Sequence, residues 1–411
     1  MAKISAFKAL RPARDKVHLV ATRPYYSYKK NVLKAKLEDN PYTFLRIINP
    51  EFDKTVKTKA NSLERFGLVK DKYKEFIEQG ILIKDTEAHI YIYRQTKDGH
   101  AFTGIIAGAC LEEYEQNLIK KHEATLTSRE AMFTEYLDIV GYNAEPVLLS
   151  YPDEKEIDFL LEKYITERPE YEFTTTDRIT HELWVLNSTD SNSIIKSFET
   201  LQATYIADGH HRSASSAGLK KQRSNTSKNH FPNEDYFLAF FINENRLKIL
   251  EFNRLVKTLN KFTNSEFVGK LSSSFHIISL AKSTKPKHEH QITMCLEGKW
   301  FELNCKPHII DESHPVKCLD AEILTHYVLQ PILGIHDLKT DENIEFVSGA
   351  ENIESFEERI KKGKFRVGFI LFPASMNQVK KVADNHMIMP PKSTWVEPKL
   401  RSGLTIYYIN E

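Results

Sequence analysis

One segment of the chain combines residue types that could bind a phosphate-bearing ligand. Residues 205–215 read Tyr-Ile-Ala-Asp-Gly-His-His-Arg-Ser-Ala-Ser, in which a β-rich run ends at Asp208 and small residues suited to a helix follow. When a strand enters a helix through a glycine turn, the first backbone N–H groups of the helix have no partner within it, so they attract anions. Gly209 can adopt a positive φ, and Arg212 can fork onto phosphate oxygens. The segment therefore predicts a strand, a tight anion-binding turn and a helix.

The polar residues of this turn have further candidate roles. His210 and His211 add two hydrogen-bond donors, which are charged or neutral as the site dictates. Asp208 is an acid among cations, so it could bind a metal ion or a substrate ammonium group rather than the phosphate itself. The alternative is that Asp208-Gly209 forms only a type I′ turn or the turn that begins a helix, and that the histidines cap it.

Phosphoryl transfer needs anchored phosphates, a neutralising cation and a carboxylate that orients the attacking hydroxyl. Taken alone, His122-Glu123 is typical of the polar end of a helix, and Asn253-Arg254, which follows a predicted strand, is typical of a surface pair. Residues 392–399 place two lysines, a serine and a threonine where they could fold back on a nucleotide or form a solvated tail.

The run Asp208-Gly209-His210-His211-Arg212 resembles the phosphate-binding signature of the ParB/sulfiredoxin-like superfamily, and in particular of its free serine kinases. Four segments in order along most of the chain are also similar to the motifs of a bacterial and archaeal family known as domain of unknown function 1015. These segments are YIYRQ at 91–95, IKKHEAT at 119–125, ADGHHR at 207–212 and MPPKSTWVEPKLRSGL at 389–404.

The superfamily resemblance implies an activity and a set of site residues. In the free serine kinases a His-Glu pair upstream of the DGHHR run carries the base, which implies Glu123 as the general base here. The implied reaction moves a phosphoryl group from ATP or ADP, with Mg²⁺, to a small hydroxylated metabolite, first of all free L-serine. The implied site consists of Glu123, Asp208 and His211 as catalytic groups; Gly209, His210, Arg212, Ser213, Arg254 and Lys392 around the nucleotide; His122 and Thr125 around the substrate; and Asp208 at the metal.

Two rival functions stay open: a non-catalytic nucleotide-sensing module and a ParB-like nucleic-acid-associated protein. Sulfiredoxins put a reactive cysteine in this turn, whereas this chain has His210 there and no cysteine between Cys110 and Cys295. This argues against thiol-based reduction. We find no basic recognition helix of the kind that ParB-type partition proteins carry, which argues against partition.

Composition restricts the class of protein. The 411 residues allow about two or three domains, and 41% hydrophobic with 27% charged residues is typical of a globular protein. No apolar run approaches the ~18–20 residues that a membrane span needs, and the N-terminus lacks a secretory pattern, so we expect a cytoplasmic protein. The net charge of +1 argues weakly against nucleic acid as a partner, and the four cysteines are too few for a disulfide framework.

The coarse pattern predicts a mixed α/β fold in three parts. Residues 1–88 form an N-terminal helical or mixed region, 89–259 a ParB/sulfiredoxin-like catalytic core, and 260–411 a C-terminal α/β region with a motif-bearing tail. Strands are expected over Phe275–Leu280 and Gln291–Leu296.

Three local expectations concern the surroundings of the turn. Residues 111–121 look like a charged helix, and the segments 235–243 and 246–253 look like the two strands of a hairpin. Residues 220–233 are basic, polar and contain proline, which favours a mobile loop that could close over the site.

Overall fold

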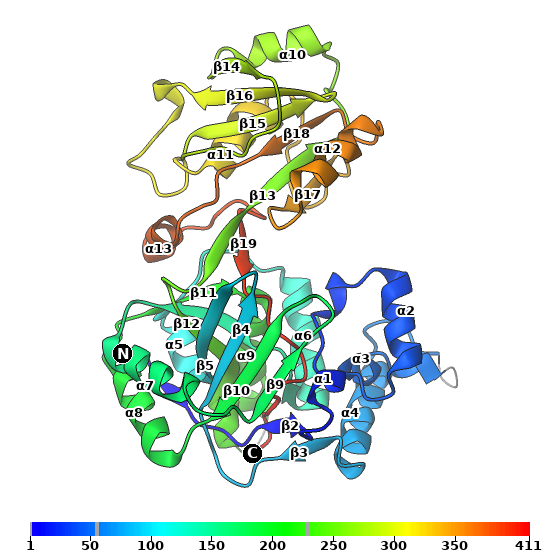
Figure 1. Cartoon of the computed structure of the whole chain (residues 1–411), viewed down its shortest axis with the longest axis vertical. Coiled ribbons are helices and arrows are strands. Elements are labelled where there is room, and N and C mark those ends of the chain that lie inside the picture. The colour runs from blue at the N-terminus through cyan, green and yellow to red at the C-terminus, as the bar shows by residue number, and fades with distance from the viewer. Residues whose placement is uncertain (1, 54–56, 227–229) are drawn as a thin grey trace. The chain divides into compact units, whose positions relative to one another are not determined.

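The structure is a computed structural model that describes residues 2–53, 57–226 and 230–411 (Figure 1). By their internal packing these residues form two compact units. Unit 1 comprises Met1–Lys121, Thr125–Leu247 and Pro398–Glu411, and unit 2 comprises His122–Ala124 and Lys248–Glu397. Both units combine helices with sheets, so the mixed α/β fold class is confirmed. The division at residues 88 and 259 stays a prediction.

Unit 1 is built around a sheet with the strand order β6-β11-β8-β12-β5-β4-β10-β9, to which β1 adds beside β5. Its elements are β1 (Ile4–Ser5), β2 (Leu10–Pro12), α1 (Val17–Val20), η1 (Tyr25–Ser27), α2 (Lys30–Asp39), α3 (Phe44–Ile48), η2 (Pro50–Asp53), α4 (Leu63–Glu78), β3 (Leu82–Lys84), β4 (Tyr91–Lys97), β5 (His100–Cys110), α5 (Leu111–Glu115), β6 (Ile119–Lys120), α6 (Thr127–Val140), β7 (Tyr142–Asn143), β8 (Val147–Tyr151), α7 (Lys155–Ile165), β9 (Tyr171–Thr174), β10 (Thr180–Val185), α8 (Ser188–Glu199), β11 (Thr204–Asp208), α9 (His210–Thr226), η3 (Pro232–Asp235), β12 (Tyr236–Asn243) and β20 (Tyr407–Tyr408).

One face of this sheet is covered by α7 and α8. Side chains from α7 and α8, among them Leu161 and Phe198, pack with Leu149 of β8 and Phe241 of β12 into one apolar core (Figure 1). Successive residues of a strand point to opposite faces, so the neighbours of these residues form the other face. There Leu148 lies opposite Phe240 in the register of β8 and β12.

A local irregularity in β11 decides on which face the predicted turn begins. Ile206 pairs with Leu149, but the register then shifts so that Asp208 pairs with Leu148. Residues directly opposite each other in a sheet share a face. Asp208 therefore begins the turn on the face of Leu148 and Phe240, away from the core under α7 and α8.

Unit 2 contains an antiparallel sheet with the strand order β14-β16-β15-β18-β13-β17, and β19 pairs with the first half of β13. Its elements are β13 (Lys248–Val256), α10 (Asn264–Leu271), β14 (Phe275–Leu280), β15 (Gln291–Leu296), β16 (Lys299–Cys305), η4 (Pro307–Ile309), α11 (Asp320–Leu324), the π-helical turn η5 (Thr325–Leu329), β17 (Ile344–Ser348), α12 (Ile353–Lys361), β18 (Val367–Ile370), α13 (Met376–Asp384) and β19 (Thr394–Glu397). The strands predicted over Phe275–Leu280 and Gln291–Leu296 are confirmed as β14 and β15.

The predicted hairpin of residues 235–253 is wrong. Both strands exist, as β12 and β13, but β12 pairs with β5 and β8 whereas β13 pairs with β17, β18 and β19. Two adjacent apolar strands resemble a hairpin in the sequence because the pattern gives their length and spacing but not their partners.

Two further local predictions need correction. The helix expected over residues 111–121 ends at Glu115, and β6 follows at Ile119. The loop expected over residues 220–233 is helical up to Thr226, where α9 ends, and η3 begins at Pro232; residues 227–229 lie outside the described residues. Lys and Gln are good helix formers, so α9 continues through the basic stretch. Among the described residues, no helix has the length and apolar character that crossing a membrane requires.

Candidate functional site

The predicted strand, glycine turn and helix are present in unit 1. β11 ends at Asp208, Gly209 has a φ of 105°, and α9 begins at His210. A Cβ atom on Gly209 would lie 2.8 Å from Nη2 of Arg212, so a larger residue would meet both backbone strain and a clash. The N–H groups of Arg212 and Ser213 donate to the Gly209 carbonyl at 2.9 and 3.1 Å, which starts the helix directly after the turn.

Asp208 lies in a cluster of four charged side chains and one hydroxyl, which we call the Asp208 cluster: Glu145, Asp208, Arg212, Lys399 and Ser402. Nζ of Lys399 is 3.0 Å from Oδ2 of Asp208, and Nη2 of Arg212 is 3.9 Å from the same oxygen. Nη1 of Arg212 also donates to Glu145, whose other oxygen accepts from the Ser402 hydroxyl at 3.0 Å. The Asp208 side chain is 35% exposed, so solvent and ligands can reach the cluster.

The cluster fixes the charge of its members. Burial by itself would raise the pKa of Asp208, but the charges of Lys399 and Arg212 outweigh this effect and lower the pKa to about 2. Burial lowers the pKa of the neighbouring His210 to about 4, so its ring is neutral at pH 7. The turn therefore offers Arg212 and Lys399 as its cations and His210 as a neutral group.

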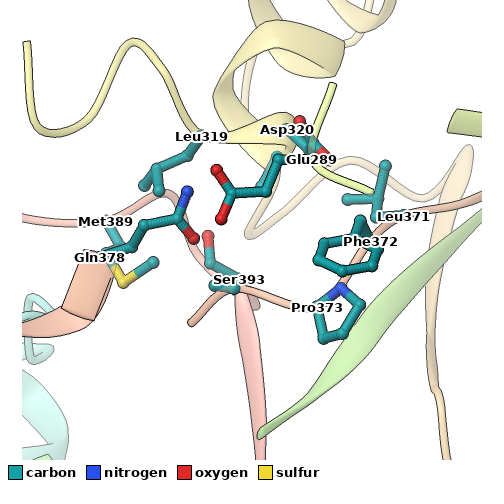
Figure 2. A pocket seen from close by; sticks show the side chains of 11 residues that line it. Glu289, Leu319, Asp320, Leu371, Phe372, Pro373, Gln378, Met389 and Ser393 are labelled. Carbon is teal, nitrogen blue, oxygen red and sulfur yellow. The ribbon is translucent and has the colours of Figure 1, made fainter. Parts of the chain in front are cut away.

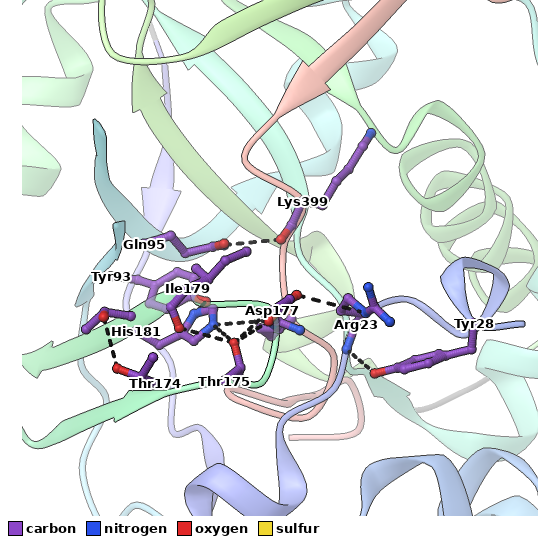
Figure 3. A network of polar contacts seen from close by, with 12 residues as sticks. Arg23, Tyr28, Tyr93, Gln95, Thr174, Thr175, Asp177, Ile179, His181 and Lys399 are labelled. Carbon is purple, nitrogen blue, oxygen red and sulfur yellow. Dashed lines mark hydrogen bonds and ion pairs between the residues drawn. The ribbon is translucent and has the colours of Figure 1, made fainter. Parts of the chain in front are cut away.

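The C-terminal segment, residues 398–411, supplies two of the cations on this face of unit 1. The backbone carbonyl of Lys399 accepts from Gln95 on β4 at 3.3 Å, which holds the segment against the sheet (Figure 3). Two residues later, Nη2 of Arg401 donates to both oxygens of Asp177 at 2.9 Å. The segment is thus anchored at Lys399 itself and two residues after it, which fixes the position from which Lys399 reaches Asp208.

A buried histidine completes this anchor. Nε of Arg401 donates to Nε2 of His181 at 3.2 Å, and Nδ1 of His181 lies 2.8 Å from the Tyr93 hydroxyl (Figure 3). Because Nε2 accepts, the ring proton lies on Nδ1 and the ring is neutral. Burial and the charge of Arg401 lower the pKa of His181 to about 3, in agreement with this assignment.

The remaining predicted residues lie elsewhere. His122, Glu123, Arg254 and Lys392 belong to unit 2, whereas Thr125 is a half-buried residue of unit 1. The structure therefore brings together Asp208 and the following residues up to Ser213 in one unit, and assigns the predicted base to the other. Ser213 is buried, and its hydroxyl donates to the His210 carbonyl at 3.1 Å.

Some of the alternative interpretations are now excluded. His122 and Glu123 lie outside any helix, so they are not the polar end of one. Arg254 is fully buried within β13 beside the ring of Phe346, which excludes a surface pair, and burial lowers its pKa to about 9. Part of the expected solvated tail forms β19, and the ammonium group of Lys392 lies 5.4 Å from the ring centroid of Phe252.

The described residues do not by themselves offer a complete Mg²⁺ site. No group of three His, Cys, Asp or Glu side chains in the described part of the chain could hold a metal ion. Asp208 could supply one carboxylate, but two cations already contact it. Mg²⁺ commonly binds proteins through one or two carboxylates together with substrate phosphates. The expected metal fits only as part of a Mg²⁺–nucleotide substrate.

Three members of the Asp208 cluster, Glu145, Lys399 and Ser402, are not predicted from the sequence. Glu145 carries no motif, since it lies alone before β8. Lys399 lies in the stretch singled out for its two lysines, of which Lys392 is the one expected to contact the nucleotide. Nothing in the spacing of that stretch tells which lysine reaches a carboxylate 191 residues away.

Comparisons with known proteins were made for the whole chain. A family model described as "Protein of unknown function (DUF1015)" matches residues 4–322. No curated protein matches. Solved structures that are similar include a free serine kinase in complex with AMP, with 14% identity, a TM-score of 0.38, and coverage of 75% of this chain and 91% of that chain.

Two further solved structures are similar at the same level. SbnI with C-terminal truncation from Staphylococcus aureus has 12% identity and a TM-score of 0.39, covering 74% of this chain and 87% of that chain. A conserved hypothetical protein from Pyrococcus furiosus has 15% identity and a TM-score of 0.33, covering 72% and 90%. With TM-scores below 0.5, these similarities assign no activity to this chain, whose function has to be argued from its own residues.

Proposed function

We propose a function for this chain, which belongs to the DUF1015 family. It is a phosphotransferase that acts on a small hydroxylated metabolite and uses ATP or ADP as the donor. Free L-serine is the first acceptor to test. The observation that carries the proposal is the Asp208 cluster at the start of α9, where Arg212 and Lys399 meet beside a glycine turn.

The physical argument starts from the two cations. Arg212 and Lys399 are paired with carboxylates in positions that solvent reaches, with about a quarter of each side chain exposed. Partly exposed ion pairs contribute little to stability, so a polyphosphate can replace a carboxylate as the partner at small cost. The N-terminus of α9 adds the positive end of a helix dipole.

Five of the predicted residues have a chemical role in the proposed reaction. The substrate hydroxyl attacks the terminal phosphorus of the nucleotide, its proton passes to a general base, for which the sequence resemblance implies Glu123, and the shortened nucleotide leaves. Asp208 holds the substrate ammonium group or contributes a ligand to the Mg²⁺–nucleotide. His210 donates as a neutral ring, and His211 with Arg212 stabilises the charge that develops on the transferred group.

The test incubates the full chain with ATP or ADP, Mg²⁺ and a panel of amino acids, and measures phosphorylated products by mass spectrometry. Glu123→Ala is expected to lower turnover at least about 100-fold while the Kd for nucleotide changes by less than about threefold. Arg212→Ala is expected to raise that Kd at least about tenfold, because it removes a charge-assisted hydrogen bond. Glu135→Ala and Lys221→Ala, both exposed positions, serve as matched controls and should leave both quantities unchanged.

Three results would contradict the proposal. Equal activity in wild type, Glu123→Ala and Arg212→Ala would end the assignment of the site. Nucleotide binding without any product would support the rival function, a nucleotide-sensing module. Retention of DNA or RNA that weakens steeply with salt would instead favour a ParB-like nucleic-acid-associated protein.

A further inference from the structure

Unit 2 contains a small pocket far along the chain from the turn at Gly209, which we call the Asp320 pocket. Its polar lining consists of Glu289, Asp320, Gln378 and Ser393, and its walls include Leu371 and Met389. Figure 2 shows the polar ends of Glu289, Gln378 and Ser393 directed into one space. The cavity volume is about 20 Å³, which suits a guest group the size of about one water molecule.

Asp320 is the unusual member of this lining because one of its oxygens lacks a partner. Its Oδ1 accepts from the backbone N–H of His290 at 2.9 Å and lies 3.2 Å from Nδ1 of the same residue. Its Oδ2 is buried and has no hydrogen-bond partner in the described part of the chain, although the residue is only 8% exposed. Buried carboxylate oxygens in native proteins are nearly always hydrogen-bonded, so this oxygen calls for a donor from outside the chain.

Of the other polar groups, Ser393 presents an acceptor, whereas Gln378 presents a donor. The Ser393 hydroxyl donates its hydrogen to the Pro390 carbonyl at 2.7 Å, which leaves its lone pairs for a guest. Oε1 of Gln378 already accepts from the Ser375 N–H at 3.0 Å in the capping box of α13, which fixes this side chain and leaves its Nε2 as a donor. With two carboxylates and a hydroxyl oxygen in the lining, the pocket favours a cationic donor.

The kind of cation follows from the rest of the lining. Divalent metals need several oxygen ligands, and the described residues hold no group of three candidate side chains. An ammonium group needs fewer acceptors and has the size of about one water molecule, and the part-exposed apolar residues of the lining, Phe372 and Pro373, suit a short alkyl stem outside the cavity.

We propose that the Asp320 pocket binds the ammonium group of a small primary alkylamine, with Oδ2 of Asp320 as its main acceptor and Glu289 as a second carboxylate. The site lies within unit 2, and its occupation does not depend on the phosphotransferase activity proposed above. Either proposal can therefore fail while the other stands.

The test titrates n-propylammonium chloride into the full chain at constant ionic strength and follows binding by ligand-observed NMR. We expect saturable binding with a Kd of about 1 mM, because a guest of so few atoms cannot bind much more tightly. The matched ligand is n-propanol, which has the same shape without the charge and should bind at least about tenfold more weakly.

Variants separate the proposed site from the rest of the surface. Asp320→Asn should raise the Kd for n-propylammonium at least about tenfold, whereas the surface control Asp311→Asn should leave it unchanged. Gln378→Glu keeps the capping box and adds a carboxylate, so it should lower the Kd several-fold. Circular dichroism verifies the fold of each variant, and if Asp320→Asn fails to fold, Gln378→Glu and Glu289→Gln decide.

The proposal is overturned if n-propylammonium does not bind, if n-propanol binds as tightly, or if well-folded Asp320→Asn and Gln378→Glu bind the amine as wild type does. Displacement of the amine by an equal concentration of Mg²⁺ at the same ionic strength would also overturn it, in favour of a metal site.

Discussion

Asp208 in unit 1 and Asp320 in unit 2 both lie where a helix begins, yet their pKa values are shifted in opposite directions. Burial disfavours the charged form of each, but Lys399 and Arg212 outweigh burial at Asp208 and lower its pKa to about 2. At Asp320 burial prevails over the contacts with His290, and the pKa is raised. The comparison shows that the cations around a carboxylate, and not its residue type, decide the direction in which its pKa is shifted.

The source of those cations differs between the two units. In unit 1 the C-terminal segment brings Lys399 to Asp208 and Arg401 to Asp177. In unit 2 the side chain paired with Asp320 is the histidine His290, and one oxygen of the carboxylate has no hydrogen-bond partner among the described residues. Asp208 therefore faces two cations, whereas Asp320 faces one histidine and keeps one oxygen for a ligand.

Among the variants considered, we expect Arg401→Ala to destabilise unit 1 the most. The substitution removes the partner of Asp177 and the donor to His181, and the Arg401 side chain is almost fully buried. We expect a loss of about 2–4 kcal/mol in the free energy of unfolding of unit 1, measured by hydrogen exchange with mass spectrometry of its peptides. The exposed Arg168→Ala should change it by less than about 0.5 kcal/mol, and equal effects would contradict the role given to Arg401.

Gly209→Ala tests the turn that presents Asp208. Its φ of 105° and the close approach of Arg212 make any side chain unfavourable. We therefore expect a loss of about 1–3 kcal/mol in the free energy of unfolding of unit 1, again measured by hydrogen exchange. Gly269 is the matched position in unit 2, because it lies in the exposed part of α10 with nothing within 4 Å of an added Cβ. Gly269→Ala should stabilise by about 0.4–1 kcal/mol, and a destabilisation there as large as at Gly209 would refute the conformational explanation.

Acidification should affect the two units with opposite signs. His181 has a folded-state pKa of about 3, so the unfolded chain binds a proton below about pH 6.5 that the folded unit 1 does not. The titration of His181 should therefore cost unit 1 up to about 1.4 kcal/mol for each pH unit below that value, or about 2 kcal/mol by pH 5, and His210, whose pKa is lowered to about 4, acts in the same direction.

For Asp320 the raised pKa means that protonation on acidification favours the folded state, so this group contributes stability to unit 2 as pH falls. Hydrogen exchange at pH 7 and pH 5, corrected for intrinsic rates, measures both changes. His181→Gln should reduce the slope of the free energy of unfolding of unit 1 against pH by the contribution of up to one proton, or about 1.4 kcal/mol per pH unit. If its slope equals that of wild type, His181 is not the group that titrates.

Asp208→Asn and Asp320→Asn give the smallest effects and the most direct comparison. Asp208 is partly exposed, so the loss of its ion pairs should cost about 0.5–1 kcal/mol in unit 1. Asp320→Asn keeps an acceptor for His290 and removes a buried charge, so unit 2 should be unchanged or more stable by up to about 1 kcal/mol. A loss at Asp320 larger than at Asp208 would reverse the interpretation of the two sites.

Local patterns predict the elements well where a strand or helix is bounded by turn residues. The bounds of β14 and β15 follow from apolar runs between polar loops, and the turn at Gly209 follows from a β-rich run that ends in Asp-Gly. The predicted length of α9 is too short, because a polar, basic stretch has the composition of a loop even where its residues favour a helix. The predicted partners of β12 and β13 are wrong, because strand pairing is decided by contacts between distant segments.

The chain's own residue order therefore determined the strand, the positive-φ glycine and the helix that place Asp208, His210 and Arg212 together, since all three lie within one turn of backbone. Only the tertiary structure decided that Lys399 rather than Lys392 pairs with Asp208, that Glu145 pairs with Arg212, and that Oδ2 of Asp320 is left without a partner among the described residues. The physical reason is range: backbone conformation is set by neighbours along the chain, whereas the charge state of a buried group is set by whatever the fold brings within a few ångströms of it.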